Sequence, residues 1–217
     1  RRASAFAPKS ARISRWLLMH ADDPVKQRDL AQATDMDEGF TSRIVSRLEE
    51  ENFILRGQNG EIHLRDPDLL LDAWREAHDF SMHQIIHGHL ATRSGEEAIR
   101  HLAAGLHGEG LRYAATGLAA AWLLTKFSGF RLATMYVAER PASEVLEALG
   151  FREEERGANV WIVVPKDEGV FQGAGERDGI ACVHPVQAYL DLGDQPERAK
   201  EAAEQLRSEL LKWGSDA

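Results

Sequence analysis

Two arginines, Arg43 and Arg47, lie four residues apart in the segment FTSRIVSRLEEE. In a helix this spacing places both side chains on one face, one turn apart, with Ser42 and Ser46 beside them. A guanidinium can grip guanine through two hydrogen bonds, and a serine hydroxyl can contact the edge of any base. These residue types therefore predict a helix that enters the major groove of double-stranded DNA.

Basic residues on both sides of this helix extend the predicted contact to the DNA backbone. Lys26, Arg28 and Arg56 are expected to contact phosphates, which position a protein without reading sequence. The N-terminal Arg1, Arg2, Lys9 and Arg12 are candidates for further phosphate contacts or for an arm in the minor groove. The complete predicted DNA-binding set is Lys26, Arg28, Phe40, Thr41, Ser42, Arg43, Ser46, Arg47 and Arg56.

Three consecutive acids, Glu49, Glu50 and Glu51, favour a different interpretation. Carboxylates close to the groove repel phosphate, so this module could instead contact protein and hold its arginines on a solvated face. The acids stand at the far end of the helix, where domains of this kind usually turn away from DNA. DNA binding is therefore the preferred prediction, by analogy with the usual role of the module.

The charge is distributed unevenly along the 217 residues. The whole chain has a formal net charge of −9, yet residues 1–47 contain nine Lys or Arg and six Asp or Glu. A small basic region on an acidic body fits local DNA contact by one end of the molecule. It argues against non-specific binding over the whole surface.

The periodicity of residues 11–80 predicts the elements that must position these side chains. Helical patterns cover residues 11–20, 26–34 and 39–52, and an Asn-Gly turn in GQNG joins two short alternating runs into a hairpin. Asp66 and Pro67 then have the residue types of a helix cap and first helical position. Three helices and a two-stranded wing predict a winged helix-turn-helix, so residues 1–80 are expected to form a DNA-binding domain with a linker helix.

Residues 81–217 alternate between strand-like and helical patterns, which predicts a mixed-sheet domain of the α/β or α+β class. Strands are expected in HQIIHGHLA, LRYAA, RLATMYVAE and GIACV, and FREEE and NVWIVVP are expected to pair with each other. Ser94 and Thr116 are expected to cap the helices that follow them. Further helices are predicted in ASEVLEAL, in HPVQAYLDL and from residue 196 to residue 213.

The order of YAATGLAAAWLL and the strand RLATMYVAE resembles the start of a nucleotidyltransferase domain. Such enzymes hold divalent metal with carboxylates one residue apart on this strand. Here the inward-facing candidates are Ala133 and Met135, and the only acid, Glu139, stands at the end of the strand. Thr116 and Gly117 replace the usual Gly-Ser element. We therefore expect a degenerate nucleotidyltransferase fold with no catalytic residues, and enzymatic activity is the least favoured hypothesis.

Together with VWIVVPKDEGVF and CVHPVQAYLDLGDQPERAKEAAEQLRSELL, these segments resemble the AbiEi-type antitoxins and transcriptional regulators of type IV toxin–antitoxin systems. QRDLAQATDMDEGFTSRIVSRLEEENFI resembles the MarR-type winged helices of bacterial regulators. The family resemblance implies a cytoplasmic autorepressor that binds promoter repeats. It also implies a partner gene for a nucleotidyltransferase-type toxin, opposed directly or only genetically. Solitary members exist, so a solitary or ligand-responsive regulator is the alternative. The wing tip lacks the Lys or Arg usual in the family.

Four other groups of residues could bind ligands or do chemistry, and each has a plainer structural explanation. They are the histidines of HDFSMHQIIHGHL (His78, His83, His87 and His89), the glycines of EGVFQGAGERDG, the pair Cys182 and His184, and the pair Gln187 and Asp191. None has the spacing of a known metal, phosphate or nucleophile motif. The glycine-rich segment is expected to form a surface loop. The prediction is no metal, no cofactor and a buried structural thiol at Cys182.

Hydrophobicity and cysteine content bear on the environment of the chain. No apolar run approaches the roughly 18 residues that span a bilayer, so no membrane partner is expected. The single cysteine, Cys182, excludes a disulfide within the chain and fits a reducing cytoplasm.

Overall fold

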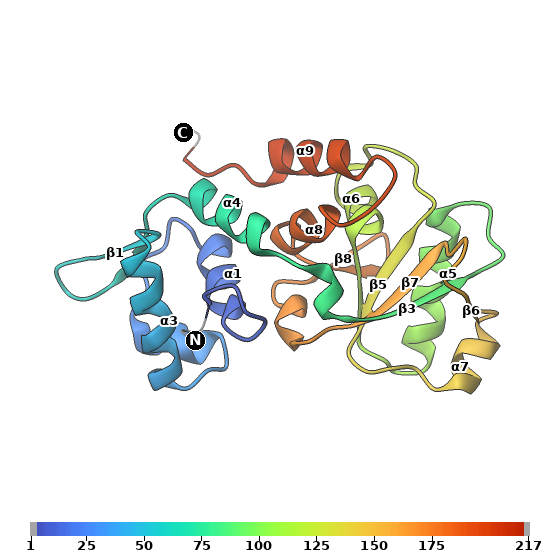
Figure 1. Ribbon diagram of the computed structural model, residues 1–217, viewed down its shortest axis with the longest axis horizontal. Coiled ribbons are helices and arrows are strands. Elements are labelled where there is room, and N and C mark those ends of the chain that lie inside the picture. Colours follow the sequence, from blue (N-terminus) through green and yellow to red (C-terminus); the bar gives the residue numbers. More distant parts are fainter. Residues whose placement is uncertain (1–3, 215–217) are drawn as a thin grey trace. The chain divides into compact units, whose positions relative to one another are not determined.

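The computed structural model describes residues 4–214 (Figure 1). The chain divides into two compact units. Among the described residues, the first unit contains residues 4–78 together with 213 and 214, and the second contains residues 79–212. Each unit has its own hydrophobic core, so each is described by itself.

The first unit consists of four helices and one hairpin. Its elements are α1 (Ala11–Met19), α2 (Gln27–Ala33), α3 (Glu38–Glu50), β1 (Ile54–Arg56), β2 (Ile62–Leu64) and α4 (Pro67–Ala77). Asp66 caps α4 by accepting hydrogen bonds from the backbone amides of Asp68 and Leu69, with Pro67 at the start. The predicted cap is thus present, and it fixes where the chain leaves the hairpin.

The two strands of the hairpin pair with each other, and β2 also bonds to the segment just before α2. Ile54 pairs with Leu64 and Arg56 pairs with Ile62 in antiparallel register. Val25, just before α2, forms an isolated bridge with Ile62. Ile54 and Ile62 are both fully buried, so one side of this short sheet contributes to the core of the unit.

The second unit contains one sheet of seven strands with helices on both faces (Figure 1). Its strands are β3 (Gln84–His89), β4 (Tyr113–Thr116), β5 (Ala133–Val137), β6 (Arg152–Glu153), β7 (Val160–Val164), β8 (Gly175–Arg177) and β9 (Ile180–Cys182). Its helices are η1 (Phe80–Met82), α5 (Gly95–Gly108), α6 (Gly117–Thr125), α7 (Ser143–Ala148), η2 (Glu168–Phe171), α8 (Pro185–Leu192) and α9 (Ala199–Leu210).

The strand order is β6-β3-β7-β5-β4-β9-β8. β5 runs parallel to β7 and antiparallel to β4, and β4 runs parallel to β9, so the sheet is mixed. Every residue of β5 is buried. The central strand is therefore covered on both faces, as its continuous apolar sequence requires.

The structure corrects three expectations in this unit. The strands expected to pair around Arg156 and Gly157 do not pair, because β3 lies between β6 and β7 and bonds to both. The glycine-rich segment expected as a surface loop contains β8, which forms a hairpin with β9. Thr116 makes no capping hydrogen bond to α6, because its hydroxyl donates instead to Asp191.

The predicted cap at Ser94 is present. Its hydroxyl accepts a hydrogen bond from the amide of Glu97 at the start of α5. The Glu97 carboxylate reaches back to the amide of Arg93, one residue before the cap. This differs slightly from a standard capping box, in which the bond returns to the cap residue itself.

Candidate nucleic-acid interface

Helix α3 is fixed at its start by Asp37, whose carboxylate accepts a 2.7 Å hydrogen bond from the amide of Phe40. One face of the helix is buried and consists of Thr41, Ile44, Val45 and Leu48. Thr41 is fully buried and its hydroxyl donates to the carbonyl of Asp37. Thr41 therefore belongs to the core rather than to the predicted contact surface, where a side chain must reach outward.

The opposite face of α3 presents polar and basic side chains. Arg43 and Ser46 are exposed, and Ser42 and Phe40 are partly exposed. The guanidinium of Arg43 lies 5.5 Å from the centre of the Phe40 ring, and Lys9 lies 5.7 Å from the same ring. The Phe40 ring at the start of α3 thus has two cations beside it, Arg43 from the same helix and Lys9 from the segment before α1.

Two other arginines of the predicted set, Arg47 and Arg56, are held by carboxylates. Arg47 Nη2 lies 2.7 Å from Glu51, one turn further along α3. Arg56 on β1 donates from Nε to Glu49 at 3.0 Å and from Nη2 to Gln27 at 3.4 Å. The acids that weakened the DNA prediction therefore contact two of its arginines.

The remaining predicted phosphate contacts lie on or before α2. Lys26 donates from Nζ to the backbone carbonyl of Asn59 in the turn between β1 and β2. Arg28 is 84% exposed and lies 3.9 Å from Glu38. Arg12 is mostly buried and bonds to the carbonyl of Thr34. Arg1 and Arg2 lie outside the described residues.

A buried cluster of polar side chains occupies the second unit, and most of its members could not be grouped from the sequence. Asp191 on α8 is fully buried and accepts hydrogen bonds from Thr116 (2.6 Å), Tyr136 (2.8 Å) and Gln187 (2.9 Å). The hydroxyl of Tyr136 also lies 3.2 Å from Nε2 of His83. The bond between Gln187 and Asp191 agrees with the structural interpretation of that pair. Polar residues on an otherwise apolar strand and helix were the available signal.

Gln195 occupies the start of α6, at Gly117 and Leu118, where the resemblance to nucleotidyltransferases would place a Gly-Ser element. Its side-chain oxygen accepts a 2.8 Å hydrogen bond from the amide of Leu118, and its nitrogen donates to Thr134. A Cβ on Gly117 would lie 2.3 Å from this amide group. Ala133 and Met135, at the positions expected for metal-binding acids, are fully buried. The helix start is therefore filled by the chain itself.

Cys182 and His184 do not form a nucleophile and base. Burial raises the pKa of the Cys182 thiol to about 12, so the reactive thiolate is disfavoured. The Nδ1 atom of His184 accepts a hydrogen bond from the amide of Val186 and caps α8. Both residues have structural roles, as the sequence analysis favoured.

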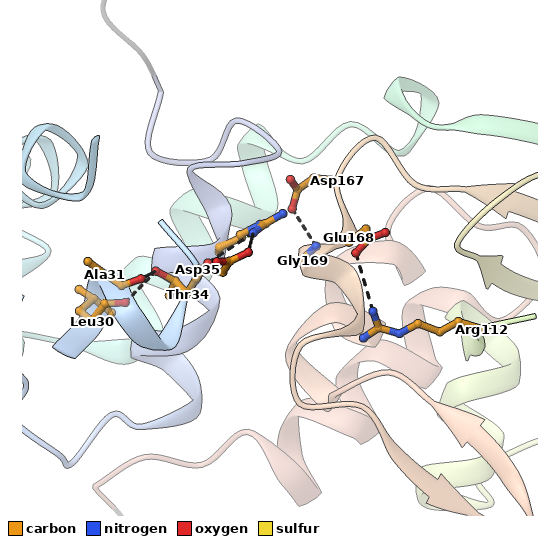
Figure 2. A network of polar contacts seen from close by, with 9 residues as sticks. Leu30, Ala31, Thr34, Asp35, Arg112, Asp167, Glu168 and Gly169 are labelled. Carbon is orange, nitrogen blue, oxygen red and sulfur yellow. Dashed lines mark hydrogen bonds and ion pairs between the residues drawn. The ribbon is translucent and has the colours of Figure 1, made fainter. Parts of the chain in front are cut away.

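Local polar contacts also account for the acids near the glycine-rich segment (Figure 2). Asp167 accepts a 2.7 Å hydrogen bond from the amide of Gly169 and caps η2. Glu168 lies 3.9 Å from Arg112. In the first unit, the hydroxyl of Thr34 turns back on α2 and donates to the carbonyl of Leu30 (Figure 2). These contacts cap or brace helices.

The histidines of residues 78–89 are dispersed. His87 and His89 lie on strand β3, so the spacing that would bring histidines together on one face of a helix does not apply to them. The His87 ring packs edge-on against Trp161, while His83 joins the polar cluster around Asp191. Within residues 4–214, no group of three or more histidine, cysteine or acidic side chains is placed to hold a metal ion. In the same part of the chain, no helix has the length and apolar character needed to cross a membrane.

Comparison with known families matches residues 63–212 to a family described as transcriptional regulator, AbiEi antitoxin, type IV toxin–antitoxin system. No curated protein and no solved structure matches the chain. The matched segment runs from β2 through α9, so it includes the whole mixed sheet and the buried cluster around Asp191. The chain therefore belongs to the AbiEi family of transcriptional regulators, the antitoxins of type IV toxin–antitoxin systems.

Proposed function

We propose that this antitoxin represses its own promoter by binding repeated DNA sequences through α3. In this proposal residues 1–80 form a winged helix-turn-helix and residues 81–217 form the antitoxin domain. The observation that carries the proposal is the exposed start of α3, where Arg43 and two serines stand opposite a fully buried apolar face. Such a helix can enter the major groove while its core face stays packed.

The contact surface proposed for DNA is the predicted set without Thr41, together with Lys9. Arg43, Ser42 and Ser46 are placed to meet base edges, and Lys9 and Arg28 to meet phosphates, since phosphates position a protein and base edges specify it. A free guanidinium on guanine is worth about 1–3 kcal/mol of discrimination. Phe40 would support the cations beside it.

The mixed-sheet unit is proposed to be a nucleotidyltransferase-like shell that performs no catalysis. Supporting this are the absence of any acid in the β5 sequence ATMYV and the occupation of the α6 start by Gln195. The test is incubation with nucleoside triphosphates and Mg²⁺ or Mn²⁺. We expect no metal-dependent turnover, and turnover abolished by mutating one particular acid would contradict the proposal.

The test of DNA binding is capture of genomic fragments by the purified full chain at moderate salt, followed by sequencing. We expect enrichment of one promoter that contains repeats and lies upstream of the protein's own gene. Binding without enrichment that disappears as salt rises would instead support a protein-contact role, because non-specific binding rests on counterion release. A reporter fused to the enriched promoter then measures repression.

The partner proposed from the family is a nucleotidyltransferase-type toxin encoded beside this gene. Co-expression of the two genes should restore the growth of cells that the toxin alone arrests. Size-exclusion chromatography of the mixed proteins then separates a direct complex from opposition that is only genetic. Failure to restore growth with any adjacent gene would favour a solitary regulator.

A further inference from the structure

Three of the four arginines of the proposed DNA surface, Arg43, Arg47 and Arg56, are in different electrostatic states. Arg43 stacks near Phe40 and makes no ion pair among the described residues. Arg47 and Arg56 each contact a carboxylate at 3.0 Å or less. An arginine paired in this way contributes little net charge at the distance of a phosphate, so the three side chains cannot be equivalent in binding.

The pair of Arg47 with Glu51 is partly shielded from solvent. The two side chains are 33% and 34% exposed, and Nε of Arg47 is buried without a hydrogen-bond partner within the described residues. The side chain is thus held against the helix by one end of its guanidinium. To reach a base, Arg47 would have to leave Glu51, which lies one turn toward the end of α3.

The pair of Arg56 with Glu49 joins the wing to the same end of α3. The side chains are 31% and 43% exposed, and Gln27 provides a second acceptor for the guanidinium. Arg56 is therefore bound to the body of the first unit from two directions. This arrangement holds the wing arginine near α3 and makes it a poor free phosphate contact.

We propose that Glu49 and Glu51 lower the affinity of this surface for DNA of any sequence by holding Arg56 and Arg47 away from the DNA backbone, so that sequence is read mainly through Arg43. This inference rests on the proposed function of α3. Non-specific affinity comes almost wholly from phosphate contacts, whereas discrimination comes from base contacts. Neutralising two potential phosphate contacts lowers the non-specific affinity and preserves the discrimination between sequences. Glu49 and Glu51 act through the arginines and are positioning residues.

The test compares the unmodified protein with the double variant Glu49→Gln and Glu51→Gln. Glutamine keeps the shape and removes the charge that holds each guanidinium. Two released arginines should steepen the slope of log affinity against log salt by about 2 units, since each phosphate contact contributes roughly 0.9. At 0.1 to 0.2 M salt, the affinity of the double variant for a random duplex should be about tenfold higher than that of the unmodified protein, while the ratio of promoter to random affinity stays the same.

A control of equal charge separates this mechanism from general electrostatics. Asp22→Asn with Asp29→Asn also raises the net charge by two, and neither acid forms an ion pair in the described part of the chain. We expect this control to leave the slope of log affinity against log salt unchanged, because it releases no arginine. A second comparison adds Arg47→Gln and Arg56→Gln to the Glu49 and Glu51 variant, which should cancel the gain in salt slope.

The outcomes separate the inference from the proposed function. If the unmodified protein selects its promoter but the Glu49 and Glu51 variant behaves like the Asp22 and Asp29 control, the inference is wrong and the proposed function stands. If the unmodified protein selects no promoter, the proposed function itself fails. Thermal unfolding of every variant checks that the first unit remains folded, so that any loss of binding is attributable to the surface.

Discussion

The hydroxyl of Tyr136 on β5 donates a 2.8 Å hydrogen bond to Asp191 on α8, 55 residues later in the chain. Thr116, at the end of β4, donates to the same carboxylate oxygen. This carboxylate thus ties α8 to two adjacent strands of the sheet. The polar side chains of the strands therefore attach a helix to the sheet. The resemblance to nucleotidyltransferases would instead place metal-binding acids on β5, at Ala133 and Met135.

Replacing Asp191 with alanine should destabilise the second unit strongly. Three buried donors would lose their acceptor, and each unsatisfied buried group costs about 1–3 kcal/mol. We expect a loss of at least about 3 kcal/mol in the free energy of unfolding, measured by urea titration. Glu204→Ala, on the exposed side of α9, is the matched control and should change it by less than about 0.5 kcal/mol. Equal effects of the two variants would contradict a role for the cluster in stability.

Gly117 and Gln195 should show strong energetic coupling. Gly117 has a φ of +58°, and a side chain there would also collide with the Gln195 amide. Gly117→Ala should cost about 1–3 kcal/mol, and Gln195→Ala about 1–2 kcal/mol through the lost acceptor of Leu118. The double variant should cost less than the sum, because shortening Gln195 removes the collision. A double-mutant cycle by urea unfolding measures this, and strict additivity would show that the collision is unimportant.

The stability of the second unit should fall at alkaline pH because of Cys182. Its pKa is about 12 in the folded protein and 9.0 for an ordinary cysteine, so the unfolded chain loses this proton first. The contribution is fully present below pH 9 and is lost as the pH rises toward 12. Relative to a Cys182→Ala variant, the protein should lose about 2 kcal/mol between pH 8 and pH 10.5, at about 1.4 kcal/mol per unit above pH 9. Parallel pH profiles of the two proteins would contradict this.

The double substitution Arg43→Ala and Arg47→Ala should remove sequence preference and leave the fold intact. Arg43 alone should account for most of the effect, about 5- to 150-fold in promoter affinity, because its guanidinium is free of any carboxylate among the described residues. Competition binding with promoter and random duplexes measures this. If the double variant still selects the same DNA, α3 is not the recognition helix.

The helices of the first unit were predictable because they carry local signals, either a cap at the boundary or a helical spacing of buried residues. Asp66 followed by Pro67 predicts the start of α4. The helical spacing of Thr41, Ile44, Val45 and Leu48 predicts the buried face of α3. Both kinds of signal are local, so no knowledge of the tertiary structure is needed to read them.

The sheet order and the polar cluster were less accessible because they depend on residues far apart in the chain. The insertion of β3 between β6 and β7 joins segments about 70 residues apart, and no local pattern encodes it. Thr116 has the residue type of a helix cap, yet a buried carboxylate 75 residues away is its partner. Gln195 instead accepts the hydrogen bond at the start of α6, and helix-capping propensities would not select it. In the candidate site, the positions of the arginines were predictable from spacing, but their pairing with Glu49 and Glu51 was not.

A backbone amide can only donate, and the amide of Lys166 lies 3.0 Å from Nδ1 of His83. Nδ1 must therefore carry the lone pair, and in the neutral imidazole the hydrogen sits on Nε2. Nε2 then donates to the oxygen of Tyr136, which leaves the phenolic hydrogen for Asp191. The hydrogen bonds from His83 to Tyr136 and from Tyr136 to Asp191 therefore both point toward the carboxylate. Reversing them would require Nδ1 of His83 to give up its hydrogen bond from the backbone amide of Lys166. The backbone amide of Lys166 thus sets the tautomer of His83, and with it the direction of the hydrogen bonds that run from His83 through Tyr136 to Asp191.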